Sequence, residues 1–139
     1  MWQGQYETTT DVPARVLFKA IADVNNWNKW DSELEFTKLK QQPNKGATFV
    51  LKPKGGPKVS MSIEEFVPDA RFVDISHLPF GKMRTIHEFN TVNDKTTIKI
   101  QVQVWGPLGF LWRRVVAEKQ VKGAAAQTAS FINYARTNS

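Results

Sequence analysis

The stretch from Asp23 to Asp31 places two tryptophans, Trp27 and Trp30, immediately before a long run of strand-like sequence. Residues three apart lie on the same face of a helix, so both indoles are expected on one face of a short helix. Because Trp carries a large apolar surface, the pair is expected to cap a hydrophobic interior where this helix docks onto a sheet. The segment constrains the fold, and it identifies neither a ligand nor a reaction.

The residues before this segment predict a strand and a first short helix. Residues 2–10 favour a strand. Pro13 suits the first turn of the helix that follows, and Thr10 or Asp11 is expected to cap it. This helix should end at Asp23, and its apolar face consists of Val16, Leu17, Ala20 and Ile21.

Six further strands are predicted between the tryptophans and Trp105. Pro, Gly, Asn and Asp mark the turns, and Asn93-Asp94 tolerates the left-handed backbone of a tight hairpin. The last strand alternates apolar and polar residues, as a half-buried antiparallel strand with one wet face does. The predicted strands cover residues 35–41, 48–52, 58–67, 71–77, 83–92 and 95–105.

A long helix is predicted over residues 110–135, after a break at Gly106–Gly109. Gly123 within it indicates either a bend or a close approach by another segment. An antiparallel sheet buries its apolar face, and only this helix is large enough to cover it. The expected fold is α+β: a seven-stranded curved antiparallel sheet wrapped around the long C-terminal helix. Two short helices follow strand 1, and a cavity is expected between sheet and helix.

Length and composition exclude several classes of protein. With 139 residues, the chain is expected to form a single domain, residues 1–139. It has no cysteine, which excludes disulfides, thiol chemistry and Cys-ligated metal sites. It has no apolar run of about 18 residues and no signal-peptide pattern at its start, so a cytoplasmic location is expected.

The net charge of +6 permits an anionic partner such as nucleic acid, a membrane surface or an acidic ligand. The lysines are scattered among apolar residues and turns, as on a solvated outer sheet face. No concentrated basic stripe or known nucleic-acid motif is present, so no specific nucleic acid is predicted. A weak contact with an anionic membrane stays open, as does the choice between monomer and homodimer.

Several features together resemble a known group of proteins. They are the helix start at Pro13, Asp23 followed by Trp27 and Trp30, the Pro68-Asp69 turn, the paired strands that end at Gly106-Pro107, and the long C-terminal helix. Their order resembles the START-related helix-grip superfamily (SRPBCC), and within it the polyketide cyclase/dehydrase-like group. The resemblance implies a ligand tunnel between sheet and helix, in proteins that bind or move lipids, sterols, polyketides and hormones. A minority catalyse cyclisation or dehydration, and since they share no catalytic motif, the resemblance implies a pocket and not a reaction.

His87 is the main candidate for chemistry. It alternates with Met83, Thr85 and Phe89, which suggests an inward-facing position where an imidazole acts as acid or base or binds a ligand carbonyl. The alternative is a histidine whose hydrogen bonds are satisfied by a neighbouring backbone or carboxylate group. The choice of inner face is also open, because Ile86 on the opposite face is apolar.

The acidic candidates are Asp74, Glu64, Glu65 and Glu88. Glu64 and Glu65 are adjacent and should point to opposite faces of a regular strand unless a bulge intervenes. Which face of strands 58–67 and 71–77 points inward is left open by the sequence. His77 is expected to be exposed, and two histidines without fixed spacing do not predict a metal site. No glycine-rich phosphate loop is present, so no cofactor is predicted.

These residues predict a domain that binds a small hydrophobic ligand, such as a lipid, polyketide or isoprenoid-like molecule, between sheet and helix. One alternative is a cyclase or dehydratase that uses His87 with an inward carboxylate. Another is a surface interaction module for an anionic membrane or RNA. The loops Leu78–Gly81 and Gly106–Gly109 are expected gates. The expected ligand-binding residues are Trp27, Trp30, Phe49, Met61, Met83, Thr85, His87, Phe89, Val102 and Phe131, with His87 also the catalytic candidate.

Overall fold

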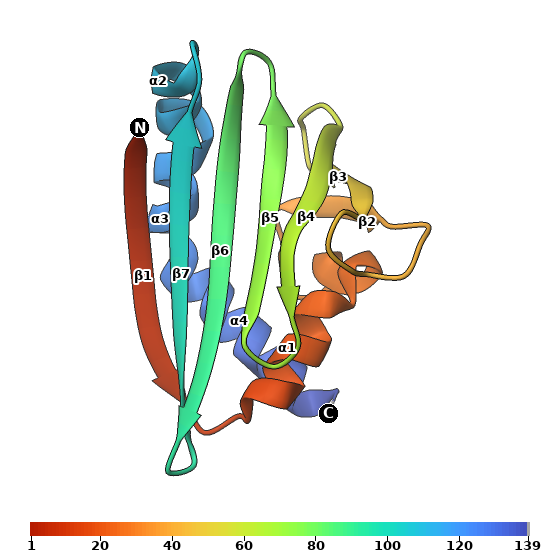
Figure 1. Ribbon diagram of the computed structural model, residues 1–139, viewed down its shortest axis with the longest axis vertical. Coiled ribbons are helices and arrows are strands. Elements are labelled where there is room, and N and C mark those ends of the chain that lie inside the picture. The colour runs from red at the N-terminus through yellow and green to blue at the C-terminus, as the bar shows by residue number, and fades with distance from the viewer. Residues whose placement is uncertain (139) are drawn as a thin grey trace.

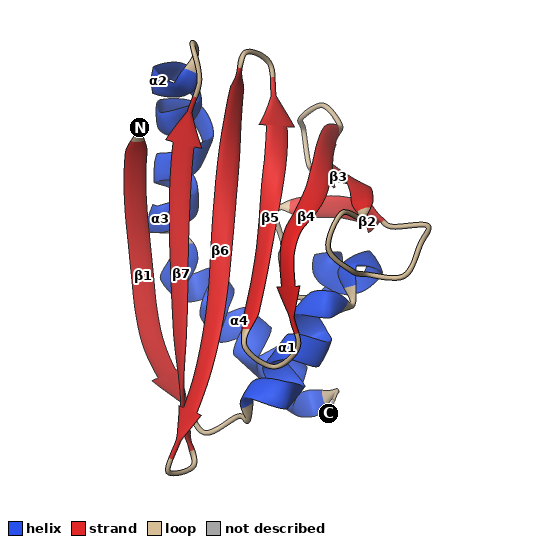
Figure 2. Ribbon diagram, viewed as in Figure 1, coloured by secondary structure: helices blue, strands red, loops and turns tan. Residues whose placement is uncertain are grey.

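The computed structural model describes residues 1–138. One sheet dominates it, with the helical segments gathered on one of its faces (Figures 1 and 2). The strands are β1 (Trp2–Thr10), β2 (Leu34–Lys38), β3 (Thr48–Pro53), β4 (Val59–Val67), β5 (Arg71–Leu78), β6 (Gly81–Val92) and β7 (Lys95–Trp105). The helices are α1 (Ala14–Ala22), the 3-10 helix η1 (Val24–Lys29), α2 (Gly109–Trp112), the π-helix η2 (Arg113–Ala117), α3 (Glu118–Lys122) and α4 (Ala124–Thr137).

The seven strands form one antiparallel sheet in the order β1-β7-β6-β5-β4-β3-β2. The C-terminal helical segments run behind β1, β7 and β6, while α1 lies near the C-terminal end of α4 (Figure 1). The predicted helix-grip architecture is confirmed. Every predicted strand is present, with ends shifted by a few residues because turns rather than apolar patterns set the ends.

Aromatic side chains fill the inner face of the sheet. Trp27 packs edge-on against Phe49 and Phe72, with ring centroids 5.4 and 6.0 Å apart. Trp30 packs against Phe131 of α4 at 4.8 Å. The tryptophan segment therefore closes the interior as predicted, and its rings occupy much of the space between sheet and helix.

The start of α1 differs from the sequence prediction. Neither Thr10 nor Asp11 caps this helix; Pro13 stands at the N-cap and offers no side-chain cap. The backbone N–H of Ala14 instead donates to the Thr91 hydroxyl of β6 at 3.2 Å. A cap from 77 residues away is a tertiary contact, which local sequence patterns cannot reveal.

The long C-terminal helix is interrupted. Gly123 separates α3 from α4, so of the two alternatives predicted for this glycine, a bend or a close approach, the structure favours the bend. The segment before it includes a π-helical turn, and α3 contains no buried residue. The apolar pattern of this helix predicts Ala125 on its inner face and Gln127 outside. Ala125 is instead exposed, and Gln127 is half-buried and donates to Asp31 at 2.6 Å. The prediction treated residues 110–135 as one regular helix. The interruption at Gly123 and the π-turn change which residues of this segment face the sheet.

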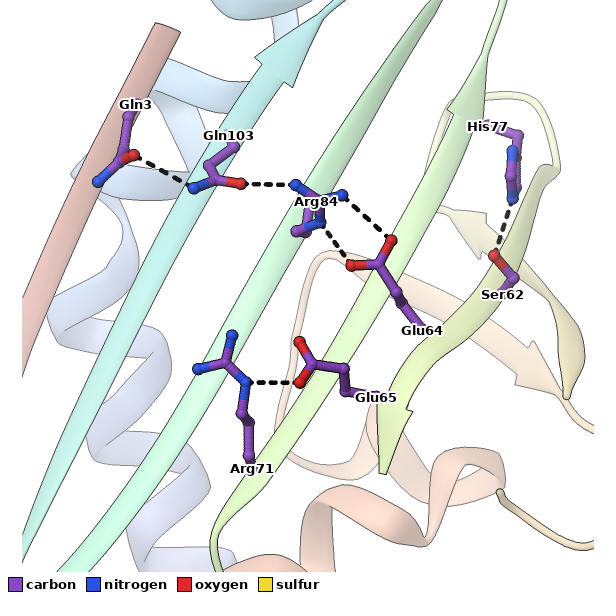
Figure 3. A network of polar contacts seen from close by, with 8 residues as sticks. All are labelled: Gln3, Ser62, Glu64, Glu65, Arg71, His77, Arg84 and Gln103. Carbon is purple, nitrogen blue, oxygen red and sulfur yellow. Dashed lines mark hydrogen bonds and ion pairs between the residues drawn. The ribbon is translucent and has the colours of Figure 1, made fainter. Parts of the chain in front are cut away.

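The outer face of the sheet carries a network of charged and polar side chains (Figure 3). Arg84 donates to both carboxylate oxygens of Glu64 and to Gln103. Arg71 pairs with Glu65 and Glu88 at 3.1 Å each. A register shift between Ile63 and Glu65 marks a bulge in β4, so both glutamates serve the outer network, and neither is an inward carboxylate.

Among residues 1–138, no helix is long and apolar enough to cross a membrane. The cytoplasmic location remains a prediction.

Candidate ligand site between the sheet and the C-terminal helix

A small hollow lies between β1, β6 and β7 on one side and α3 and α4 on the other. Its volume is about 10 Å³, room for about one water molecule. The alanines of the C-terminal helix are too small to fill the space inside a curved sheet, which predicts a larger cavity than this one. The aromatic rings fill that space instead, and Gly4 lets Val121 approach β1 so closely that an added Cβ would lie 2.9 Å from it. The lining residues are Tyr6, His87, Ile100, Val102, Gln120, Val121, Ala124 and Gln127.

His87 faces this hollow, as the alternation in β6 predicted. Its Nδ1 lies 3.2 Å from the carbonyl oxygen of Phe72. A carbonyl only accepts hydrogen bonds, so the neutral ring carries its proton on Nδ1 and its lone pair on Nε2. Burial lowers the pKa of His87 to about 4, although the hydrogen bond to the Phe72 carbonyl acts to raise it. At neutral pH, His87 is therefore an uncharged hydrogen-bond acceptor or base.

Asp74 of β5 is the inward carboxylate. It pairs with Thr85 across the β5–β6 ladder, while Phe72 pairs with His87, so Asp74 and His87 are diagonal neighbours on the inner face. Asp74 is 3% exposed, and no residue within 1–138 gives it a hydrogen bond or ion pair. Burial raises its pKa to about 7, so near neutrality the protonated carboxyl is a donor.

Two further polar atoms are buried without a partner in the described chain: Nε1 of Trp30 and Oγ1 of Thr128. Both belong to the region where η1 meets α4. Trp30 packs on Phe131, one helical turn beyond Thr128, and the neighbours Asp31 and Gln127 are hydrogen-bonded. Each buried polar group without a partner costs about 1–3 kcal/mol. The interior therefore contains unused hydrogen-bonding capacity at both Asp74 and this second position.

The residues predicted to bind a ligand are distributed over this interior. His87 and Val102 line the hollow, and the Thr85 hydroxyl accepts a 3.3 Å hydrogen bond from Gln120. Met83 belongs to a smaller cluster with Val102, Val104 and Ala117. The others are buried in the main core, and Trp27 donates to the Ile21 carbonyl. These are Trp27, Trp30, Phe49, Met61, Phe89 and Phe131.

The sequence did not single out four polar residues of the interior. Asp74 was one of several acidic candidates, and only the register of β5 distinguishes it. Gln120, Gln127 and Thr128 lie on the C-terminal helix, where an interruption at Gly123 obscures the helical pattern. No group of three or more metal-ligating side chains occurs in the described part of the chain. The site offers neutral donors and acceptors within an apolar shell.

The fold and this inward-facing set define a helix-grip protein, and comparison with known proteins identifies the family. Residues 1–131 match the family model described as polyketide cyclase/dehydrase and lipid transport. The chain belongs to this family. No curated protein matches the sequence.

Solved structures share the fold at low identity. The hypothetical protein jhp0584 of Helicobacter pylori superposes with a TM-score of 0.80 at 15% identity, covering 96% of this chain and 88% of the other. The protein Ara h 8.0201 gives 0.72 at 15%, covering 98% of each. The di-domain ARO/CYC BexL from the BE-7585A biosynthetic pathway gives 0.71 at 15%, and the match covers 94% of this chain and 45% of BexL.

Proposed function

We propose that this protein, as a single domain, binds a small hydrophobic ligand between the inner sheet face and the C-terminal helix. The unpartnered buried groups of Asp74, Trp30 and Thr128 are the main support. A ligand with polar groups on an apolar body satisfies them and gains about 25 cal/mol per Å² of buried apolar surface, before entropic losses. The family's description, which includes lipid transport, agrees with this class of ligand.

Entry requires the site to open, since the hollow holds about 10 Å³. The segment Gly109–Lys122 is the element best suited to move. It buries only Gly109 and Ala117, contains the π-turn, and ends at Gly123. Its hydrogen bond from Gln120 to Thr85 is long at 3.3 Å. Displacing this segment widens the hollow and exposes half-buried side chains of Trp112, Val116 and Val121, which pack against Met83, Val102 and Val104.

Titration with N-phenyl-1-naphthylamine, a neutral apolar fluorophore, tests this proposal. Ala124 is buried and lines the hollow, whereas Ala125 is exposed on the same helix. We expect Ala124→Leu to fill the hollow and abolish the fluorescence increase, and Ala125→Leu to bind the probe like the wild type. Equal binding by both variants, with unchanged circular dichroism, would exclude the interior as the site.

The diagonal placement of Asp74 and His87 on the inner face favours a second candidate function, a cyclase or dehydratase. A neutral acid and a neutral base lie on adjacent strands of one inner face. His87 Nε2 accepts a proton from a substrate carbon or hydroxyl, and the Asp74 carboxyl donates to a carbonyl or a departing hydroxyl. Turnover of a linear polyketide mimic should then disappear in both Asp74→Asn and His87→Gln. If the wild type binds this mimic without converting it, the enzyme hypothesis fails and a carrier role is left.

Contact with an anionic membrane is the third proposal. Phe80 and Phe110 are 74% and 66% exposed, and Arg114, four residues after Phe110, is exposed as well. Hydrogen bonds from Trp112 to Pro79 and from Leu108 to Phe80 hold the β5–β6 turn and α2 together. An aromatic edge beside basic residues suits an interfacial position. Phe80→Ser/Phe110→Ser should reduce co-sedimentation with phosphatidylserine vesicles; unchanged sedimentation would reject this contact.

A further inference from the structure

A basic groove on the outer face of the sheet forms a second hollow, separate from the interior. Its volume is about 520 Å³, and it is lined by Phe36, Thr37, Lys38, Lys40, Val50 and Lys58. These residues come from β2, β3 and the segments next to β2 and β4, at the end of the sheet opposite β1. The lysines appeared scattered in the sequence, but strand pairing brings three of them around one hollow.

The floor of the groove is apolar although it lies outside the core. Phe49 faces the interior and is buried, so its neighbour Val50 points to the outer face, where it is half-buried. Val50 pairs with Lys38, and Phe36 lies two residues before that lysine in β2. Half-buried apolar groups on an outer sheet face offer a surface that a ligand can cover.

The charge of the groove is uncompensated. Some basic side chains elsewhere on the molecule form ion pairs with carboxylates: Arg71 with Glu65, Arg84 with Glu64, and Lys52 with Glu35. Lys38, Lys40 and Lys58 are exposed, and none of the carboxylates within residues 1–138 lies within ion-pair distance of them. Three cations around an apolar floor attract an anion, and the floor favours an anion that carries an apolar body.

We propose that the basic groove binds a small anionic amphiphile from solution, with a carboxylate, sulfonate or phosphate group near the lysines and its apolar body against Phe36 and Val50. A volume of about 520 Å³ falls in the range of small-molecule sites. This site does not depend on the interior one, so the protein has two sites of different polarity.

Fluorescence titration with 8-anilinonaphthalene-1-sulfonate, next to its neutral analogue N-phenyl-1-naphthylamine, tests the proposal. The variant Lys38→Gln/Lys40→Gln/Lys58→Gln removes the three cations. The matched control Lys19→Gln/Lys45→Gln/Lys119→Gln removes three exposed lysines elsewhere and lowers the net charge equally. We expect the groove variant to raise the Kd of the sulfonate about tenfold, since exposed ion pairs contribute about 0.2–1 kcal/mol each. The control variant should change it less than twofold.

A single variant, Val50→Glu, tests the floor by placing a carboxylate among the lysines. It should also weaken sulfonate binding, while the neutral probe binds as before.

Sulfonate affinity that falls equally in both triple variants would show a general charge effect and refute the groove. Loss of sulfonate binding in Ala124→Leu would place the sulfonate in the interior and also refute it. Binding only to anionic vesicles, with no affinity for the free sulfonate, would identify a membrane surface and reject a free ligand. Failure of the neutral probe alone would contradict the interior site and leave the groove intact.

Discussion

The pH dependence of folding should reveal Asp74 and His87 as opposing buried groups. Asp74 keeps its proton in the folded chain up to about pH 7, whereas its ordinary pKa is 3.8. Between these values only the unfolded chain loses the proton, so stability falls as pH rises. His87 stays neutral in the folded chain down to about pH 4, whereas its ordinary pKa is 6.5. Between those values only the unfolded chain gains the proton, so stability rises with pH.

The two effects have nearly equal size and opposite sign. Each contributes about 1.4 kcal/mol per pH unit across its window, and the windows overlap between about pH 4 and 6.5. From pH 4.5 to 6.5 the pair should therefore nearly cancel in the wild type. Relative to the wild type, Asp74→Asn should gain about 2–3 kcal/mol over this range. His87→Gln should lose a similar amount over the same range.

Urea unfolding at half-unit steps of pH, followed by tryptophan fluorescence, measures these differences. Taking each variant relative to the wild type removes the contributions of other groups, including Asp31, whose pKa burial also raises. If both difference curves are flat between pH 4.5 and 6.5, neither group is buried as described. If the two variants slope in the same direction, the assignment of a neutral acid and a neutral base is wrong.

Three further variants test the packing. Thr128→Val removes a buried hydroxyl without a partner, so it should stabilise the unliganded protein by about 1 kcal/mol in thermal unfolding; a loss of stability would show that the hydroxyl is bonded. Gly4→Val should cost about 1–3 kcal/mol and speed amide exchange in residues 113–122, because its side chain meets Val121, whereas Gln5→Val on the outer face should leave that exchange unchanged. Arg84→Met should cost about 1 kcal/mol, the scale of a partly exposed pair. A double-mutant cycle with Glu64→Gln should assign most of that loss to the pair, and no coupling would contradict the network.

Periodicity and turn residues predicted most of the fold. The alternation in β7 and the Asn93-Asp94 turn could be predicted because each depends on neighbouring residues alone. Both residues of that turn adopt positive φ. Features that depend on tertiary contacts were not predictable in this way. The Thr91 cap on α1, the bulge before Glu65 and the π-turn in the C-terminal helix each depend on segments distant in sequence or on an irregularity without a local signal.

The candidate site was predicted only in part. His87 faces inward because its strand alternates regularly. Asp74 could not be distinguished, since Val73, Asp74 and Ile75 are all buried; Val73 pairs with Glu65 and Ile75 with Arg84, two members of the outer charged network. A strand buried on both faces loses the alternation that reveals its inner side. The size of the hollow was overestimated because the volume of the aromatic rings, and not that of the alanines, determines it.

A crystal structure of the protein with N-phenyl-1-naphthylamine would test the central claim most directly. The proposed function predicts the fluorophore between β6, β7 and the C-terminal helix, with Gly109–Lys122 displaced and the hollow far larger than about 10 Å³. A fluorophore bound elsewhere, with the interior still closed and filled by aromatic rings, would contradict the proposed function.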